Sequence, residues 1–406
     1  MGLDVGTTKV CVIVAEQDED GEVHITGMGT SPSSGVRQGV VVDLEGTTRA
    51  IGEAIDKAER MAGVRITAVV VGVSGGHLTS QNSRGVVAVS RPDHEISEQD
   101  VSRVVEAARV AAVPAGDREI VHLLPRDFII DGQDGVKNPV GMYGTRLEVD
   151  AHIVTGASTL LANLLKCVQR AGLESEALVL EPLASGEAVL SPAERELGVA
   201  LVDIGGGTSS VGVFAGGGLC HTAVLPYGGN HVTSDIAVGL RTSLGEAEQL
   251  KITHGCAKMS MGGDGELIEV RHIGGRSPRV LPRRVLGEII EPRVAEIFAL
   301  VKADLARSGF AHRMPAGVVA TGGTALLRGL AELITERLDV AARVGVPEVT
   351  GSVADTVSSP IYATGVGLVL RSAWQRRVGQ AAGHLNGTGT VLGRVRQWMR
   401  EFVHGA

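Results

Sequence analysis

Aromatic residues are scarce in this chain. They make up 2% of its 406 residues, although 44% of the residues are hydrophobic. The cores must therefore be built mainly from Val, Leu, Ile and Ala side chains. With 21% charged residues the composition is globular, which excludes an intrinsically disordered protein, and the length is sufficient for two or three domains.

Paired cysteines and long apolar runs are missing as well. The four cysteines are scattered without a CxxC pair, which argues against a zinc site and favours reduced thiols; they are Cys11, Cys167, Cys220 and Cys256. No apolar run approaches the ~18 residues of a membrane span, and no signal peptide is recognisable. We therefore expect neither a transmembrane helix nor export.

Charge is unevenly distributed along the chain. The net charge is −8, yet the segment from Arg371 onward has six arginines and a single acid, Glu401. The part of the chain before Arg371 is therefore more acidic than the net charge of the whole chain suggests, which argues against nucleic-acid binding. The basic tail needs an explanation of its own.

One motif occurs in both halves of the chain. Residues 2–9 read Gly-Leu-Asp-Val-Gly-Thr-Thr-Lys, and residues 202–208 read Val-Asp-Ile-Gly-Gly-Gly-Thr. In each copy an apolar run delivers an Asp, and a turn follows whose small residues let backbone N–H groups approach an anion. A single copy is typical of an ordinary tight turn. Two copies favour a duplicated fold in which both turns hold one nucleoside triphosphate.

Alternating strand-like and helix-like runs predict an α/β architecture. A turn-rich stretch, 131–144, interrupts residues 80–154, which look like a small inserted domain. After residues 321–324 a further helix is expected, and Ser97 with Asp100 three residues later predicts a capped start of the helix over 97–112. Strands are predicted over 10–15, 24–29, 40–44, 68–74, 85–90, 119–130, 146–155, 199–202, 211–214, 220–226 and 317–320, and helices over 44–62, 97–112, 160–171, 234–240 and 286–307.

The short motifs, together with Thr321-Gly322-Gly323, resemble the actin/Hsp70/sugar-kinase ATPase superfamily. Longer strings are more specific, and they resemble the bacterial cell-division FtsA family within it. These strings are residues 137–141 (Lys-Asn-Pro-Val-Gly), 196–199 (Glu-Leu-Gly-Val), 228–236 (Gly-Gly-Asn-His-Val-Thr-Ser-Asp-Ile), 253–257 (Thr-His-Gly-Cys-Ala) and 290–293 (Ile-Glu-Pro-Arg).

The resemblance implies a two-lobed actin/Hsp70-like ATPase fold of duplicated RNase H-like domains, with an inserted subdomain 1C and a C-terminal amphipathic helix. Family members usually carry several residues before the glycine that matches Gly2, so the strand before Asp4 is expected to be short, or the true start to lie upstream. The expected divisions are 1–79, 155–196 and 358–376 (core 1A), 80–154 (1C), 197–240 and 300–357 (core 2A), 241–299 (2B), 377–389 (linker) and 390–404 (membrane-targeting helix).

The family also implies ATP between the lobes. Asp4 and Asp203 would hold Mg²⁺ through water, since this ion keeps much of its hydration, and Asp203 would also orient an attacking water. Glu248 and Lys251, at i and i+3, would face the ribose or form an ordinary solvated helix pair. Lys9 would reach a phosphate or remain a solvated surface lysine. The phosphate loops would be Gly6, Thr7, Thr8 and Lys9, and Gly205, Gly206, Gly207 and Thr208, with Gly322 and Gly323 at the adenosine.

The basic tail has the pattern of an amphipathic helix. Arg394, Arg396 and Arg400 occupy one side, as expected of a helix lying among lipid headgroups. Docking of this helix on the protein's own core is the alternative. A helix of about 14 residues is marginal alone, so we expect weak, reversible membrane binding that self-assembly strengthens. The other side carries Val391, Leu392, Val395, Trp398, Met399, Phe402 and Val403.

The resemblance implies a function: a self-polymerising adaptor that tethers FtsZ, through its C-terminal peptide, to the cytoplasmic face of the inner membrane at the division site. Other divisome proteins would bind 1C, and ATP hydrolysis would be slow, with the nucleotide acting as an assembly switch. A PilM-like pilus scaffold and a sugar-kinase-type phosphotransferase are the alternatives. The residues that would bind the acidic part of the FtsZ peptide are Arg279, Arg283, Arg284 and Arg293. The alternative is that these arginines form an ordinary solvated basic face.

Overall fold

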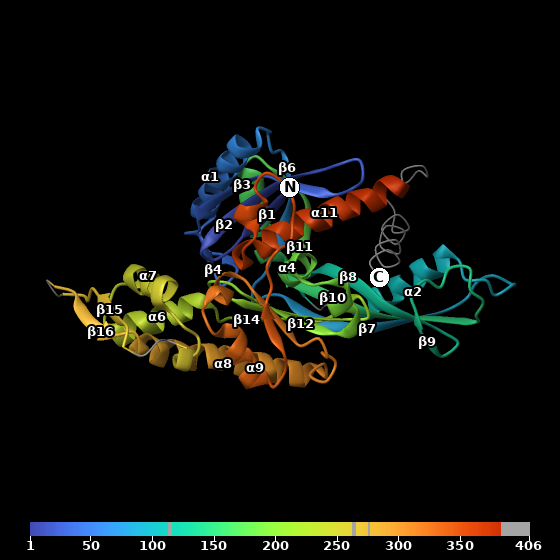
Figure 1. Cartoon of the computed structure of the whole chain (residues 1–406). Helices are drawn as coiled ribbons and strands as arrows, with labels where there is room; N and C mark the ends of the chain where they lie inside the picture. Colours follow the sequence, from blue (N-terminus) through green and yellow to red (C-terminus); the bar gives the residue numbers. More distant parts are fainter. Residues whose placement is uncertain (113–115, 262–264, 275–276, 383–406) are drawn as a thin grey trace.

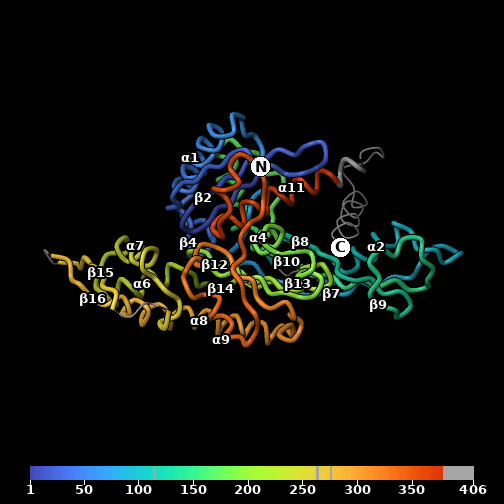
Figure 2. The backbone as a smooth tube through the Cα atoms, in the orientation of Figure 1, coloured from blue at the N-terminus to red at the C-terminus, as the bar shows by residue number. Residues whose placement is uncertain are grey.

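The computed structural model describes residues 1–112, 116–261, 265–274 and 277–382 (Figures 1 and 2). The expected membrane-targeting helix over 390–404 and residues 383–389 of the expected linker lie outside these described residues. The linker was predicted to begin at residue 377, but helix α11 (Ala363–Ala382) continues through residues 377–382. Among the described residues, no helix is both long and apolar enough to cross a lipid bilayer.

Lobe I, as we call the first half, is built on a five-stranded sheet of order β11-β6-β1-β2-β3. Strand β1 is antiparallel to β2 and parallel to β6. The Met1 carbonyl accepts a hydrogen bond from Val70 N–H (2.9 Å), and Asp4 pairs in register with Cys11, so the short first strand is held on both sides. The strands are β1 (Gly2–Val5), β2 (Lys9–Gln17), β3 (Val23–Pro32), β6 (Ala68–Val73) and β11 (Glu174–Leu180).

Lobe II repeats this sheet. Its order is β14-β13-β12-β17-β18, with β12 antiparallel to β13 and parallel to β17. When the strands of each sheet are numbered in the order in which they occur along the chain, the two sheets have the same strand order. This confirms the duplicated fold predicted from the repeated motif. The strands are β12 (Val199–Ile204), β13 (Ser209–Ala215), β14 (Gly218–Leu225), β17 (Val318–Thr321) and β18 (Ala342–Val344).

Two helices of lobe I, α4 (Glu181–Val189) and α11, lead from one lobe to the other. α1 (Leu44–Ala62) begins where the Asp43 side chain accepts from Glu45 N–H and ends at Gly63, whose φ of 68° suits glycine. Gly367 lets α11 lie directly against α4, because a Cβ there would overlap the Ala184 carbonyl. The others are α3 (Ser158–Arg170) and α5 (Pro192–Leu197).

Helix α8 (Arg284–Ser308) is the long helix of lobe II, and it runs without a break through the boundary expected between residues 299 and 300. A small hairpin of β15 (Leu267–Val270) and β16 (Arg279–Pro282) precedes it. The remaining helices are α6 (Gly229–Leu240), α7 (Leu244–His254), η1 (Met259–Met261), η2 (Gly323–Leu326), α9 (Leu330–Leu338), α10 (Ala354–Val357) and η3 (Pro360–Tyr362).

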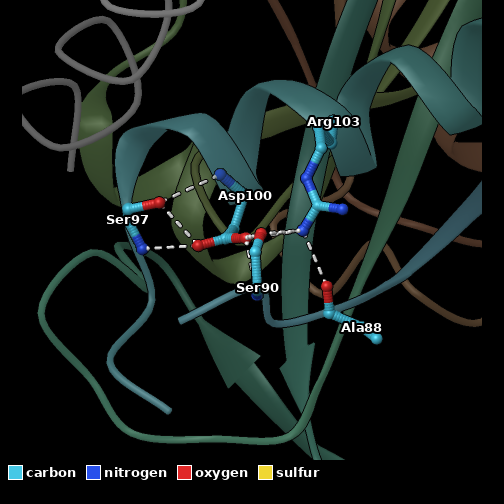
Figure 3. A network of polar contacts seen from close by, with 5 residues as sticks. All are labelled: Ala88, Ser90, Ser97, Asp100 and Arg103. Atoms are coloured by element: carbon cyan, nitrogen blue, oxygen red, sulfur yellow. Dashed lines mark hydrogen bonds and ion pairs between the residues drawn. The ribbon is translucent and has the colours of Figure 1, made fainter. Parts of the chain in front are cut away.

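Unit 1C, inserted between β6 and α3, is an antiparallel sheet of order β7-β10-β8-β9 with α2 packed on it (Figure 1). Its α2 has the expected capping box, in which Ser97 and Asp100 bond to each other's backbone N–H groups (Figure 3). The elements are β7 (Thr79–Ala88), α2 (Glu98–Ala111), β8 (Arg118–Ile130), β9 (Gln133–Val136) and β10 (Arg146–Ala157).

The stretch predicted to be turn-rich, 131–144, has turns and also contains β9, which pairs with β8. Two local predictions were wrong. The strand expected over 40–44 is only β5 (Val40–Val41), which forms a two-stranded ladder with β4 (Val36–Arg37). Helix α6 begins before its predicted start because Gly229 N–H donates to Gly205 O (2.9 Å), which extends the helix up to the second turn.

The cores are aliphatic, as the composition predicted. The cluster shared by the lobe I sheet and α4 has Phe214 as its one aromatic member among the described residues. Phe298 and Phe310 contribute to the core of lobe II, and Phe128 to that of unit 1C. Val, Leu, Ile and Ala supply most of the rest, so shape complementarity among small branched side chains holds the sheets and helices together.

Candidate nucleotide-binding site

The two repeated turns have the same geometry. In the β1–β2 turn, Gly6 N–H donates to Lys9 O (3.0 Å); in the β12–β13 turn, Gly205 N–H donates to Thr208 O (2.9 Å). Each turn follows the strand that carries the Asp of its motif. The sequence repeat is therefore also a repeat in three dimensions.

The turns face each other across the boundary between the lobes. A Cβ atom at Gly207 would lie 2.6 Å from Thr7 Oγ1, closer than side chains approach, and one at Gly206 would overlap Thr8. Thr7 Oγ1 also accepts from Gly39 N–H (3.2 Å), which fixes its side chain. Glycine is thus required at both positions for this approach.

Between the turns lies a cleft of about 380 Å³, a volume in the range of small-molecule pockets. It is lined by every residue that the sequence predicted to bind nucleotide, drawn from four separate stretches of the chain. They are Asp4, Gly6, Thr7, Thr8, Lys9, Asp203, Gly205, Gly206, Gly207, Thr208, Glu248, Lys251, Gly322 and Gly323.

Asp203 is fixed by both helices that connect the lobes. Its carboxylate accepts hydrogen bonds from Ser185 Oγ (2.6 Å) on α4 and Thr364 Oγ1 (3.1 Å) on α11. Those two hydroxyls are also 3.0 Å apart. Burial raises the pKa of Asp203. A carboxylate held in this way is oriented in advance but has an unfavourable environment for its charge, which a nearby cation would relieve.

Lys9 lies on the wall of the cleft rather than on an open surface. Its Nζ is 3.5 Å from Asp4 Oδ2 and 5.2 Å from the centre of the Tyr362 ring. Its side chain is 25% exposed. The ammonium therefore points toward the first carboxylate of the site, which leaves it within reach of the cleft.

Glu181 is the site residue that the sequence analysis missed. It is the first residue of α4, directly after β11, and it lines the cleft. Burial, and then the carboxylates of Asp4 and Asp203, raise the pKa of Glu181 to about 8. Three carboxyl groups thus converge in one cleft, and two of them come from the repeated motif.

This set of carboxyl groups fits a hydrated divalent cation. The negative charges that raise the pKa values of Glu181 and Asp203 would be neutralised by such an ion. The three carboxyl groups are too far apart to bind one ion directly together. Among the described residues, the set of three or more His, Cys or acidic side chains with all ligand atoms within 4.8 Å of one another is Asp18, Glu22 and His24. Mg²⁺ retains several waters in most sites, so carboxylates spaced in this way suit it.

Glu248 and Lys251 are paired with each other inside the cleft wall. Lys251 Nζ is 2.7 Å from Glu248 Oε2, and it also donates to Thr233 Oγ1 (2.9 Å) and Gly229 O (3.2 Å). Lys251 is buried, whereas the Glu248 side chain is 38% exposed. The pair is therefore an anchored part of the cleft and not a freely solvated surface pair.

An apolar wall adjoins the glycines predicted at the adenosine. Gly322 has a φ of +84°, and its N–H donates to Pro360 O (3.1 Å), which connects this turn to η3 just before α11. Ile252 and Leu326 are 66% and 53% exposed yet line the cleft with Ile361. Exposed aliphatic side chains beside a flexible backbone turn suit a flat heterocyclic base.

Comparison with known proteins agrees with this geometry. The model of the family "Cell division protein FtsA" matches residues 200–367, and that of the "SHS2 domain inserted in FTSA" matches residues 75–155, the range of unit 1C. The cell division protein FtsA of Pseudomonas aeruginosa is 44% identical over 98% of this chain and 97% of its own length. The chain belongs to the FtsA family of cell-division proteins. FtsA of Escherichia coli K12 is 39% identical over 99% of this chain and 97% of its own length.

Solved structures of distant proteins share the fold of this FtsA-family chain. The PilM-PilN type IV pilus biogenesis complex has a TM-score of 0.67 at 18% identity, over 92% of this chain and 98% of that one. MreB5 of Spiroplasma citri bound to ADP has a TM-score of 0.55 at 13% identity, over 95% and 98%. These identities show the fold alone, so membership of the FtsA family rests on the sequence relatives.

The arginines that the FtsA resemblance suggested for peptide binding differ in exposure and in their ion pairs. Arg283 is buried, with its guanidinium donating to His254 O (2.7 Å) and Glu266 (2.6 Å). Arg293 is paired with Asp235 (2.6 Å) and Glu296. Arg279 and Arg284 are exposed, and Arg284 lies 3.1 Å from Glu288.

Proposed function

We propose that this FtsA-family protein binds ATP and Mg²⁺ between its lobes, assembles into actin-like filaments, and tethers FtsZ to the cytoplasmic face of the inner membrane at the division site. The observation that carries the proposal is the pair of Gly-Thr turns that face each other across one cleft of the duplicated fold. Membership of the FtsA family supplies the cellular process.

In this proposal the two turns bind the phosphates. Their glycines leave backbone N–H groups accessible, and Lys9 adds a positive charge. Asp4 and Asp203 hold the hydrated Mg²⁺, whose charge neutralises both the carboxylates and the phosphates. Gly322, Gly323 and the apolar wall accommodate the adenosine, and the Glu248–Lys251 pair stands beside the ribose.

Hydrolysis, where it occurs, needs a group that orients a water molecule and accepts its proton. Asp203 was the candidate from the sequence, but its carboxylate already accepts from two hydroxyls. Glu181 lies in the same cleft, but a pKa of about 8 leaves it mostly protonated near neutral pH, so it becomes a proton acceptor only when a bound cation lowers that pKa. A slow ATPase suffices, because a switch depends on which nucleotide occupies the cleft and not on turnover.

Membrane and partner contacts complete the proposal. The amphipathic pattern of residues 390–404 supports a peripheral anchor whose single-copy binding is weak and whose filament-bound copies hold by avidity. Exposed Arg279 and Arg284 are better placed than buried Arg283 to meet an acidic FtsZ tail peptide. Unit 1C is the proposed contact for later divisome proteins.

Co-sedimentation with phosphatidylglycerol-containing liposomes tests this function. The full chain should pellet with liposomes more completely with ATP and Mg²⁺ than without, and should then retain a labelled FtsZ tail peptide. Trp398→Glu should remove liposome binding without affecting ATP binding. A variant that still pellets like the parent chain would contradict the anchor, and phosphorylation of a sugar with no lipid or peptide binding would overturn the whole proposal.

A further inference from the structure

Unit 1C belongs to lobe I by chain connection, and it packs against both lobes. Its sheet leaves lobe I after β6 and returns at α3. Strand β14, at the edge of the lobe II sheet, packs against β7, β8 and β10 (Figures 1 and 2). A unit attached to one half of the molecule therefore rests on the other half.

The contact is centred on Thr222 of β14. Its carbonyl accepts from Ser80 Oγ on β7 (2.7 Å), and its hydroxyl is 3.1 Å from His152 Nε2 on β10. His152 Nδ1 lies 2.8 Å from Asn82 Oδ1, so a ring that donates from Nδ1 accepts from Thr222 at Nε2. The carbonyl and the hydroxyl of one threonine are thus both used by unit 1C.

A second contact lies at the turn between β13 and β14. Lys137, which follows β9, donates from Nζ to Gly216 O (2.9 Å) and lies 3.1 Å from Asp127 of its own unit. Nearby, the Arg126 guanidinium of β8 lies 5.7 Å from the centre of the Phe310 ring of lobe II. Two separated contacts fix an orientation, whereas a single one would allow rotation.

The contact surface is connected to the second phosphate turn by one strand. β13 begins at Ser209, directly after Thr208 of that turn, and pairs with β14 so that Gly212 is opposite Thr222. A β ladder moves as a rigid element. Any shift of the second turn toward the first must therefore carry Thr222 and Gly216 with it.

We propose that unit 1C acts as a relay, by which we mean that its angle to lobe I changes when the nucleotide cleft opens or closes. We call the contacts of Ser80, His152 and Lys137 with β14 and the turn before it the joint. The joint makes unit 1C move together with lobe II. This inference rests on the proposed binding of ATP in that cleft. Its consequence is that a partner surface on unit 1C changes its orientation when the nucleotide changes.

The chemistry of the joint favours coupled motion over sliding. His152 is 1% exposed and Thr222 7%, so neither can exchange its partner for bulk water without separating the surfaces. Buried polar groups that lose their partners cost free energy, and a shifted register would leave His152, Thr222 and Ser80 unpaired. The surfaces therefore stay matched, and the proposal requires the movement to occur on the lobe I side, where Leu180 N–H of β11 donates to His122 Nε2 of β8 (3.0 Å).

Pulsed electron paramagnetic resonance can measure this. Spin labels on the full chain at Asp56→Cys, exposed on α1 of lobe I, and Tyr143→Cys, 69% exposed on unit 1C, report the angle between them. The four native cysteines are buried and should label slowly. Labelled chain is diluted with unlabelled chain, and distances are compared without nucleotide and with a non-hydrolysable ATP analogue and Mg²⁺.

In the parent chain the nucleotide should shift the distance distribution. The double variant Ser80→Ala, Thr222→Val should bind a fluorescent ATP analogue within about threefold of the parent but lose at least half of the shift. Thr335→Val, a matched change at an exposed helical threonine, should keep the full shift.

An unchanged distance in the parent, or a full shift in the double variant, would overturn the relay while leaving ATP binding intact. Failure of the parent to bind the nucleotide analogue would instead overturn the proposed function, and the relay with it.

Discussion

Replacing Asp100 by Ala should destabilise unit 1C by about 3–5 kcal/mol, which is unusually large for the first turn of a helix. The carboxylate is fully buried and holds three separate pieces of the unit together (Figure 3). One oxygen accepts from Ser97 N–H (2.9 Å) and Oγ (2.6 Å). The other accepts from Ser90 Oγ (2.6 Å) and Arg103 (2.6 Å).

The magnitude follows from what the alanine would leave behind. The N-cap bond itself survives, because Ser97 Oγ still accepts from the backbone N–H of residue 100, but Ser97 N–H loses its acceptor. Each buried donor left without an acceptor costs about 1–3 kcal/mol, and the Arg103 guanidinium and the serine groups all lose theirs. Burial alone would raise the pKa of Asp100, but the hydrogen bonds from Ser90, Ser97 and Arg103 hold it well below its usual range. The ionised form is therefore strongly stabilised by its partners.

Hydrogen exchange detected by mass spectrometry isolates this unit from the two lobes. Amide protons of α2 should lose about a hundredfold or more of their protection in Asp100→Ala, since 1.4 kcal/mol corresponds to a factor of ten. Glu106→Ala is the matched control, because it removes a carboxylate of the same helix whose ion pair with Arg109 (2.6 Å) is exposed. That change should cost less than about 1 kcal/mol.

Equal protection in the two variants would refute the reasoning, because it would mean that the buried network contributes no more than a surface ion pair. Loss of protection confined to Ser97 and its neighbours would also contradict it. That result would show a local cap rather than a connection that holds α2 to the strands.

Three further predictions concern the cleft, the joint and the peptide surface. Gly206→Val should abolish binding of a fluorescent ATP analogue, because its side chain would fill the approach between the turns, whereas Gly52→Ala, with open space around it, should bind normally. Burial lowers the pKa of His152 to about 3, so its neutral form stabilises the fold fully above about pH 6.5 and that stability falls toward pH 3. His152 alone should account for a loss of about 2 kcal/mol by pH 5, so His152→Gln should reduce the difference between urea unfolding at pH 7.5 and pH 5 by about that amount; His122, whose pKa burial also lowers to about 3, should maintain part of the difference. Arg279→Glu should weaken binding of an acidic FtsZ tail peptide by about tenfold at low salt, measured by fluorescence anisotropy, and an unchanged affinity would exclude this surface.

Local signals in the sequence were sufficient for much of the fold. The repeated Asp-Gly-Thr turns predicted two matching halves because a tight turn after a strand depends on the residues within it. Ser97 with Asp100 predicted the start of α2 for the same reason, since a capping box is complete within four residues. These features need no knowledge of distant parts of the chain.

Features that depend on distant partners were not predicted. Glu181 follows an apolar strand like many surface acids, and only the packing of α4 between the lobes brings it beside Asp4 and Asp203. Exposed Ile252 has no local sign of a ligand, because its role depends on lying opposite Leu326. The contacts of Thr222 with unit 1C join segments that no periodicity relates.

The position of Asp203 bears on how occupancy of the cleft could control assembly. Its carboxylate is the proposed neighbour of the Mg²⁺ ion, and it is held by hydroxyls from α4 and α11, the two helices that pass between the lobes. A cation that draws this carboxylate toward the phosphates therefore acts directly on the hinge. The same cleft is bounded by the turn whose strand leads to Thr222 and unit 1C. Because Asp203 and Thr222 lie in the same lobe II sheet, which contacts both the hinge helices and unit 1C, we infer that cleft closure and reorientation of unit 1C are a single motion, and that the nucleotide governs assembly by setting its extent.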